Sequence, residues 1–263
     1  MNVKFHKYQG AGNDFILIDN RKRIIQHGHR RLFSHWCNRH FGIGADGVIL
    51  LEKESGYDFR MVYFNSDGRE SSMCGNGGRC IIQFAHDVGI IKNHCQFIAI
   101  DGPHSGKIQS NRVSLRMADV QDIREVSSTD FILHTGSPHF VRFADDVEQL
   151  AVETKGRTIR NSKPFKQQGI NVNFAEVQGN KLFVRTYERG VEDETLSCGT
   201  GVVASVLALS FQKNSPIGKQ HRQTIETRGG LLSVSYFRSA EKAWRAIDLI
   251  GPAQRVFSGA ISC

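Results

Sequence analysis

Two cysteines of this 263-residue chain stand directly before glycine-rich turns and share a frame. Cys74 lies in MCGNGGRC (73–80) and Cys198 in SCGTGVVA (197–204), so the segment Cys-Gly-x-Gly occurs twice, nearly half the chain apart. A cysteine at a helix N-terminus lies close to N–H groups without intrahelical acceptors, and these groups and the helix dipole lower the pKa of a thiol. Glycines after the cysteine let a ligand approach the same N–H groups. The pattern predicts a reactive thiol beside an anion site, present in two copies.

Two such thiols facing each other across a domain cleft could invert a stereocentre. A thiolate on one side would remove the proton from Cα, and a thiol on the other side would deliver a new proton. Hydrogen bonds from the two helix N-termini to the substrate carboxylate would stabilise the carbanion. This scheme requires no pyridoxal cofactor and no metal. A redox disulfide between the thiols is an alternative, which we regard as a side effect of air oxidation.

The other cysteines call for a simpler interpretation. A cysteine in a cytosolic protein is usually a buried small hydrophobic residue. We accept that interpretation for Cys37, Cys80 and Cys95, since Cys80 lies on the apolar face of its expected helix and Cys37 lies beside a tryptophan. For Cys74 and Cys198 the repeated frame favours a functional role.

The elements that would position the two thiols follow from hydrophobic periodicity. In the first half we expect strands around Val3 and Phe5 and at 15–19, a helix over 29–41, strands at 47–52 and 59–65, a helix beginning after Cys74, and strands at 96–100, 106–109 and 112–117. From about Asp119 we expect strands at 131–136 and 139–143, a short helix within 150–168, a hairpin of 171–177 and 181–188, a helix after Cys198, and closing strands to Gly251. The helix after Cys198 is apolar nearly all round, so it must be buried on most sides.

The two halves match, because each has strands, a polar turn, Cys-Gly-x-Gly and a buried helix. We therefore predict an α/β fold of the α+β type with two pseudo-symmetric domains. Each would be a mostly antiparallel sheet curled around a central helix. We expect an N-terminal domain over 1–118, to which the segment 251–263 returns, and a C-terminal domain over 119–250.

Composition limits the function classes. The net charge of +8 and the pI near 9.3 invite a nucleic-acid interpretation, but the basic residues are scattered and no nucleic-acid motif accompanies them. The six cysteines contain no C-x-x-C pair, so we expect no disulfide framework. The apolar runs are too short to span a bilayer, and the first residues lack a secretory pattern. We expect a cytoplasmic protein with no nucleic-acid or membrane partner.

Three further motifs carry no chemistry in this interpretation. GPHSGK (102–107) has too few residues before Gly-Lys for a phosphate loop and is expected to form a turn. His35, Cys37 and His40 resemble metal ligands by composition, but His35 and Cys37 would point to different sides of a helix. We expect no metal site. GAGNDF (10–15) is too short for a dinucleotide fingerprint.

The sequence resembles the diaminopimelate epimerase family over essentially its whole length. The resemblance rests on GAGNDF (10–15), GIGADG (42–47), FNSDG (64–68), MCGNGGRC (73–80), GSPHF (136–140), NVNF (171–174) and YERGVEDETLSCGTG (187–201). It implies a cofactor-independent isomerase that interconverts L,L- and meso-diaminopimelate on the route to lysine and peptidoglycan precursors. It also implies two pseudo-symmetric domains that close over the substrate, and a homodimer.

The resemblance assigns roles to individual residues. Cys74 and Cys198 match the two acid–base thiols, each acting as base toward one stereoisomer and as acid toward the other. His139 and Glu188 match positions that tune the pKa values of the thiols. The residues that match substrate-binding positions are Asn13, Asn65, Gly75, Asn76, Asn171, Glu188, Arg189, Gly199 and Thr200. Among these, an arginine suits bidentate binding of a carboxylate and a glutamate suits binding of an ammonium group.

Three positions depart from the family pattern. Ser137 stands where many members carry Asn, and Gly47 stands where some carry Gln. Both changes concern recognition of the distal end of the substrate. Phe257 stands where some members have a Tyr in the dimer contact.

Three other functions are compatible with parts of the sequence. A proline or hydroxyproline racemase also uses paired cysteines, but its substrate has one carboxylate and no distal amino acid. Arg189 with three asparagines favours a longer, doubly zwitterionic ligand. A silent amino-acid-binding protein would need neither thiol, and the same observation disfavours an isomerase with a single carboxylate base.

Overall fold

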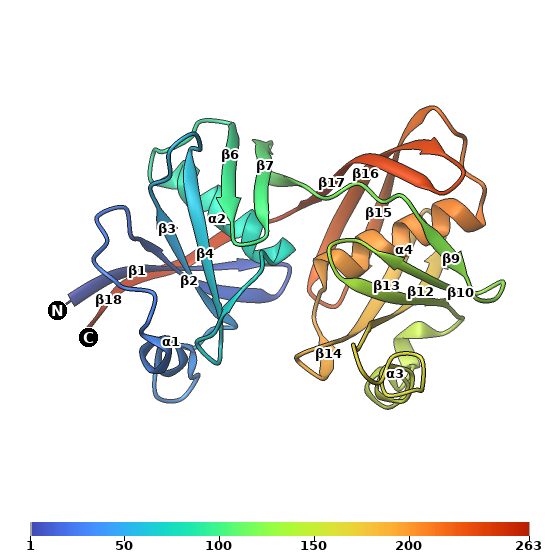
Figure 1. The fold of residues 1–263 in the computed structure, drawn as a ribbon, viewed down its shortest axis with the longest axis horizontal. Coiled ribbons are helices and arrows are strands. Elements are labelled where there is room, and N and C mark those ends of the chain that lie inside the picture. The colour runs from blue at the N-terminus through green and yellow to red at the C-terminus, as the bar shows by residue number, and fades with distance from the viewer. Residues whose placement is uncertain (1, 263) are drawn as a thin grey trace. The chain divides into compact units, whose positions relative to one another are not determined.

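The computed structural model describes residues 2–262, whose contacts divide the chain into two compact units (Figure 1). Unit 1 comprises Met1–Leu115 and Gly251–Cys263, and unit 2 comprises Arg116–Ile250. Each unit combines one large curved sheet with two α-helices. No helix among the described residues has both the length and the apolar character needed to cross a bilayer.

Unit 1 is a sheet wrapped on one long helix, α2. Its elements are β1 (Asn2–Gly10), β2 (Asn13–Asp19), α1 (Arg30–Cys37), β3 (Gly47–Glu52), β4 (Phe59–Asn65), β5 (Glu70–Ser71), α2 (Gly75–Asp87), β6 (His94–Ala99), β7 (Gly102–Gln109), β8 (Arg112–Arg116) and β18 (Gln254–Ser262). Neighbouring strands are antiparallel except in the pairs β2–β3 and β4–β6. Helix α2 contacts β1, β2, β3, β7 and β18, so the sheet curls around it.

Unit 2 repeats this plan around helix α4. Its elements are β9 (Ile123–Glu125), β10 (Asp130–His134), β11 (Pro138–Phe143), the 3-10 helix η1 (Val147–Gln149), α3 (Val152–Arg160), β12 (Asn171–Gln178), β13 (Lys181–Glu188), β14 (Asp193–Thr195), α4 (Gly199–Gln212), β15 (Lys219–Thr227), β16 (Gly230–Ala240) and β17 (Ala243–Gly251). The parallel pairs are β11–β12 and β13–β15. Helix α4 contacts β10, β11, β12, β13 and β16.

The two units match strand by strand. From β1 in unit 1 and from β10 in unit 2, the successive pairings are antiparallel, parallel, antiparallel, antiparallel to a short strand, and parallel across the central helix. An additional strand pairs with the first one in each unit, β18 in unit 1 and β9 in unit 2. The predicted fold class of two pseudo-symmetric, mostly antiparallel sheets around central helices is therefore confirmed.

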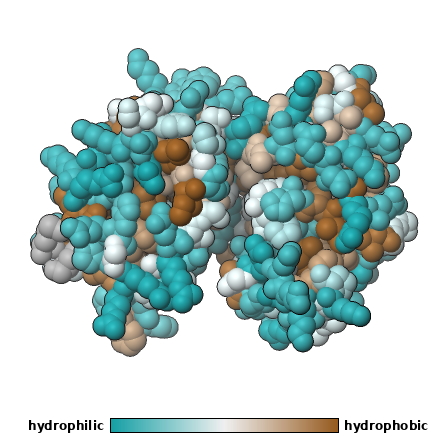
Figure 2. All heavy atoms as spheres, viewed as in Figure 1, coloured by the Kyte–Doolittle hydropathy of each residue, from teal (hydrophilic) through white to brown (hydrophobic). Residues whose placement is uncertain are grey.

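Burial explains why the two central helices form. All ten residues of α4 from Gly201 to Ser210 are buried, as expected for a helix that is apolar on every side. Two further clusters pack on the outer faces of the sheets, one under α1 around Trp36 and Phe33 and one under α3 around Tyr187 and Phe174. Hydrophilic side chains cover much of the visible face of each unit (Figure 2).

Two local predictions were wrong. Helix α1 ends at Cys37 rather than near Phe41, because Asn38 leaves the helical conformation and its Oδ1 accepts hydrogen bonds from the N–H groups of His40 and Phe41. Phe41 is consequently 79% exposed. Gly42 passes so close to the end of α1 that a Cβ there would lie 2.1 Å from the carbonyl oxygen of His35. The segment GPHSGK (102–107) forms strand β7 instead of a turn, since it pairs along its length with β6.

Candidate active site

Each central helix begins at one of the two predicted cysteines. Cys74 is the N-cap of α2 and Cys198 is the N-cap of α4, and both have extended backbone conformations. The carbonyl oxygens of Cys74 and Cys198 accept hydrogen bonds from the N–H groups of Gly78 (2.7 Å) and Val202 (2.9 Å). Within residues 2–262, neither cysteine makes a side-chain capping hydrogen bond to its own helix. The first N–H groups of an α-helix have no acceptor inside the helix.

In unit 1, a chain of side-chain hydrogen bonds surrounds the start of α2. The amide nitrogen of Asn76 donates to Oδ1 of Asn13, and the amide nitrogen of Asn13 donates to Oδ2 of Asp46 (3.0 Å). Arg79 donates to Oδ1 of Asn76 (2.9 Å) and to the carbonyl oxygen of Gly75 (3.2 Å). Burial lowers the pKa of Arg79 to about 10, so this side chain keeps its positive charge at neutral pH. Two predicted substrate-binding residues, Asn13 and Asn76, are thus held together.

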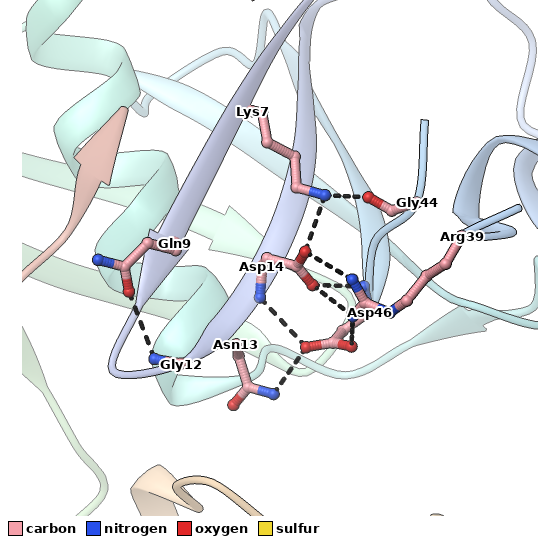
Figure 3. A network of polar contacts seen from close by, with 8 residues as sticks. All are labelled: Lys7, Gln9, Gly12, Asn13, Asp14, Arg39, Gly44 and Asp46. Atoms are coloured by element: carbon pink, nitrogen blue, oxygen red, sulfur yellow. Dashed lines mark hydrogen bonds and ion pairs between the residues drawn. The ribbon is translucent and has the colours of Figure 1, made fainter. Parts of the chain in front are cut away.

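An ion-pair cluster holds the end of this hydrogen-bond chain that lies on β2 (Figure 3). Arg39 binds Asp14 through both guanidinium nitrogens (3.0 and 2.8 Å) and Asp46 at 2.7 Å, while Lys7 lies 2.8 Å from Asp14. Although burial opposes it, hydrogen bonds from Arg39 and Lys7 lower the pKa of Asp14 to about 2. Figure 3 shows the amide of Asn13 directed at Asp46. The cluster therefore fixes the orientation of Asn13.

The departure at Gly47 has a steric basis. Gly47 pairs with Asn65 across β3 and β4. A Cβ at Gly47 would lie 2.5 Å from the carbonyl oxygen of Phe64 and 2.5 Å from Cε2 of Tyr63. The Tyr63 ring therefore occupies the space into which a side chain at position 47 would project.

In unit 2, the first turn of α4 carries the second set of predicted residues. Sγ of Cys198 lies 3.5 Å from Oγ1 of Thr200. Thr135, in the turn between β10 and β11, donates a 2.9 Å hydrogen bond to the carbonyl oxygen of Thr200. This bond joins the first turn of α4 to the end of the neighbouring strand.

Asn171 lies at the centre of a second polar group. Its amide nitrogen donates to Oγ of Ser137 (2.9 Å), and its Oδ1 accepts the N–H of Arg189 (2.8 Å). The guanidinium group of Arg189 lies 3.5 Å from the same serine oxygen. Glu188 accepts a 2.9 Å hydrogen bond from Thr195. Ser137 therefore contacts both Asn171 and Arg189.

His139 is fully buried in β11. Its Nδ1 lies 3.1 Å from the amide nitrogen of Asn173, which also donates to the carbonyl oxygen of Phe140 (2.9 Å). Burial, together with the nearby His134 and Arg189, lowers the pKa of His139 to about 3. The imidazole is neutral at physiological pH, and within residues 2–262 its buried Nε2 has no hydrogen-bond partner.

Strand register relates the predicted residues of the two units. Phe15–Gly47 is the first residue pair of the parallel strands β2 and β3, and His139–Asn171 is the first pair of the parallel strands β11 and β12. On the next, antiparallel strand of each unit, Asn65 of β4 and Glu188 of β13 occupy equivalent positions. Asn13, Gly47 and Asn65 of unit 1 therefore occupy strand positions equivalent to those of Ser137, Asn171 and Glu188 in unit 2. In unit 1 a hydrogen bond links Asn13 to Asn76 in the first turn of α2, and in unit 2 hydrogen bonds link Asn171 to Ser137 and to Arg189.

Three supporting residues were not predicted, although Asp46 lies in GIGADG, Arg79 in MCGNGGRC and Asn173 in NVNF. A usable signal existed for Asn173, because Asn171 and Asn173 alternate on one buried face of a strand. Among the described residues, no group of three or more His, Cys, Asp or Glu side chains is arranged to hold a metal ion.

The remaining described cysteines are buried, and their thiols are held in the protonated form. Burial raises the pKa values of Cys37, Cys80 and Cys95 to about 12 in each case. Cys263 lies outside the described residues.

Comparisons with solved structures support the fold. A phenazine biosynthesis protein of the PhzF family from Bacillus anthracis superposes with a TM-score of 0.77 over all of both chains at 14% identity. A hydroxyproline epimerase from Agrobacterium vitis superposes with a TM-score of 0.66 over 99% of this chain and 92% of its own, at 12% identity. At these identities the likeness is one of fold alone.

Comparisons of sequence go further. The family model described as diaminopimelate epimerase matches residues 5–118 and 131–256. A diaminopimelate epimerase from Flavobacterium psychrophilum is 47% identical over 261 residues, which cover 98% of this chain and all of the relative. One from Chlorobaculum tepidum is 40% identical over 261 residues, covering 96% of this chain and 99% of the relative. The chain therefore belongs to the diaminopimelate epimerase family.

Proposed function

We propose that the protein interconverts L,L- and meso-diaminopimelate by proton transfer at Cα between two thiols, those of Cys74 and Cys198. The observation that carries this proposal is the pair of cysteine N-caps at equivalent positions of a duplicated fold. Membership of the diaminopimelate epimerase family supports the substrate. The reaction is that of an isomerase in lysine and peptidoglycan precursor synthesis.

The proposed step balances without a co-reactant. In one direction, the thiolate of one cysteine forms an S–H bond as the Cα–H bond breaks, and the electron pair is delocalised into the substrate carboxylate. The thiol of the other cysteine then gives its proton to the opposite face of Cα and becomes the thiolate. Reversal of the two roles accounts for the opposite direction. This chemistry calls for neither pyridoxal phosphate nor a metal ion.

The helix starts supply the groups that would stabilise the carbanion. The N–H groups of Gly75 and Asn76 in α2, and those of Gly199 and Thr200 in α4, would bind the carboxylate at the reacting carbon, where negative charge develops.

The remaining predicted residues suit the rest of a doubly zwitterionic substrate. Arg189 would bind the distal carboxylate and Glu188 the distal ammonium group. Asn13, Asn65 and Asn171 would add amide contacts. His139 and Glu188 would tune the two thiols.

The domain roles and the assembly are also part of the proposal. We assign one half of the epimerase to residues 1–118 with 251–263, and the other half to 119–250. The protein would act as a cytoplasmic homodimer, and the exposed apolar side chains of Val256 and Phe257 on β18 support pairing of two copies. Light scattering of wild type and Phe257→Glu measures this directly, with a dimer expected only for the wild type.

The decisive experiment is proton NMR of L,L-diaminopimelate with the reduced protein in D₂O, without added cofactor and with a chelator present. We expect loss of the Cα–H signal and appearance of the meso isomer. Exchange of proline or a hydroxyproline instead would move the assignment to the racemase. Absence of exchange with every amino acid would leave a silent binder.

Variants of the two thiols test the mechanism in the same assay. Cys74→Ala and Cys198→Ala are expected to abolish epimerisation while circular dichroism stays unchanged. Cys95→Ala, which removes a buried thiol of β6, is the matched control and is expected to retain turnover. Robust turnover by either single active-site variant contradicts the two-thiol mechanism. A Cys→Ser change that leaves proton exchange from one stereoisomer only would separate the two roles.

A further inference from the structure

The amide of Asn173 has a fixed orientation. Its nitrogen lies 2.9 Å from the carbonyl oxygen of Phe140, which can only accept a hydrogen bond. Its Oδ1 accepts a 3.0 Å hydrogen bond from Oγ1 of Thr186. Exchanging the oxygen and nitrogen would place two oxygens face to face at Phe140, so the nitrogen must point toward β11.

This orientation decides the state of His139. Nδ1 of His139 lies 3.1 Å from the Asn173 nitrogen, which has hydrogens but no lone pair to accept with. Nδ1 must therefore be the acceptor, and a neutral imidazole then carries its proton on Nε2. The low pKa of His139 agrees with a neutral ring.

The same asparagine also touches the helix that carries Cys198. Gly201, in the first turn of α4, approaches Asn173 so closely that a Cβ there would lie 2.2 Å from Oδ1. His139 and Asn173 therefore lie on the side of the sheet that faces α4. The buried Nε2, which has no hydrogen-bond partner within the described residues, is the one donor of this group that is left for a ligand or a thiol.

We propose that Asn173 is a positioning residue that holds His139 as the neutral Nε2–H tautomer, so that the imidazole offers a hydrogen-bond donor and not a base. The proposed tautomer does not depend on the proposed function. Only its expected effect on turnover rests on that function. Unit 1 has no equivalent device, because Phe15 and Ile49 occupy the register positions of His139 and Asn173. The thiols of Cys74 and Cys198 would thus have different hydrogen-bonding environments.

Nitrogen-15 NMR of the imidazole rings tests the tautomer without any turnover. The chain has 11 histidines, and comparison with His139→Gln assigns the signals of His139. In the wild type we expect the Nε2–H tautomer at neutral pH. An Nδ1–H tautomer or an imidazolium would overturn the proposal, whether or not the protein epimerises diaminopimelate.

Variants of Asn173 test the positioning role. Asn173→Ala should give a mixture of tautomers and lower the rate of Cα–H exchange by about 10-fold or more. Asn173→Asp should draw a proton onto Nδ1, because a carboxylate can only accept there. The control Thr186→Val removes the contact to Oδ1 but keeps both donors of Asn173, and it should preserve the tautomer. An unchanged Nε2–H signal in Asn173→Asp and Asn173→Ala would show that Asn173 does not fix the ring.

Discussion

Gly201 of α4 lies against Asn173 of β12 without room for a methyl group: a Cβ on Gly201 would be 2.2 Å from Oδ1 of Asn173. The equivalent glycine of unit 1, Gly77 of α2, faces the flexible end of Ile49, and its added Cβ would lie 3.1 Å from Cδ1. The duplicated fold therefore contains a rigid polar contact in one copy and a yielding apolar contact in the other.

Alanine at these two glycines should have opposite consequences. Gly201→Ala must displace Asn173 or the start of α4, and overpacking of this kind costs about 1–3 kcal/mol of unfolding free energy. In Gly77→Ala the gain in helix propensity, about 1 kcal/mol, offsets a contact that Ile49 can relieve. Denaturant unfolding of both variants measures the difference. Equal stability of the two variants would contradict the rigid contact.

Cysteine labelling should separate the thiols by their surroundings. The pKa values near 12 of Cys37, Cys80 and Cys95 leave only about one thiolate in 10⁴ at pH 8. Cys74 is only half-buried and stands at a helix N-terminus. We expect iodoacetamide to modify Cys74 ahead of the three buried thiols, and diaminopimelate to slow that reaction, as followed by peptide mass spectrometry. Labelling of Cys80 at a similar rate would contradict the environment described for α2.

The buried neutral His139 should make the protein less stable in acid. Its pKa is about 3 in the folded protein and about 6.5 when unfolded. Below pH 6.5 the unfolded chain binds a proton that the folded chain does not, so the free energy of unfolding decreases as the pH is lowered. Between pH 7 and pH 5 this linkage costs about 2 kcal/mol, and above pH 7 it contributes nothing further.

The comparison variant for this effect is His139→Gln, which cannot titrate. Its unfolding free energy should fall by about 2 kcal/mol less than that of the wild type over the same pH interval. Other acid-sensitive groups, such as Asp14, are common to both proteins and cancel in the difference. Parallel stability curves for the two proteins would show that His139 is not held neutral.

Removal of the Asp46 carboxylate should weaken substrate binding through Asn13. Asp46→Ala removes the acceptor of the Asn13 amide while Arg39 keeps Asp14 as its partner. A lost hydrogen bond to a charged group is worth about 1.5–3 kcal/mol, so we expect KM for diaminopimelate to rise by about 10-fold or more. Asp67→Ala, which removes a solvent-exposed carboxylate of the same unit, is the control. Equal KM values for the two variants would mean that Asp46 does not orient Asn13.

Local sequence patterns predicted most of the fold and the cysteines at the starts of the two central helices. The repeated Cys-Gly-x-Gly frame located both helix starts, because N-cap chemistry and glycine requirements are local properties. The apolar run after Cys198 located the buried helix for the same reason. The end of α1 was misjudged because periodicity continues through Phe41, while the side chain of Asn38 captures the turn N–H groups and ends the helix.

What could not be predicted depends on contacts between distant segments. Asn173 meets His139, which lies 34 residues away, through a parallel strand pair that a sequence pattern does not reveal. Asp46 and Arg39 matter because they meet Asn13 and Asp14 on another strand. The lack of room for a side chain at Gly47 likewise depends on Tyr63 and Phe64 of the adjacent strand.

Because of strand β18, the two units become complete at different times during synthesis. All strands of unit 2 come from one continuous stretch of chain, whereas β1 of unit 1 pairs with β18, which follows unit 2 along the chain. Domains generally fold as units while the chain emerges from the ribosome, and pairings of high sequence separation form slowly. Unit 2 can therefore be complete while unit 1 still lacks a strand. Until β18 is made, the edge of β1 is an open template for pairing with other chains.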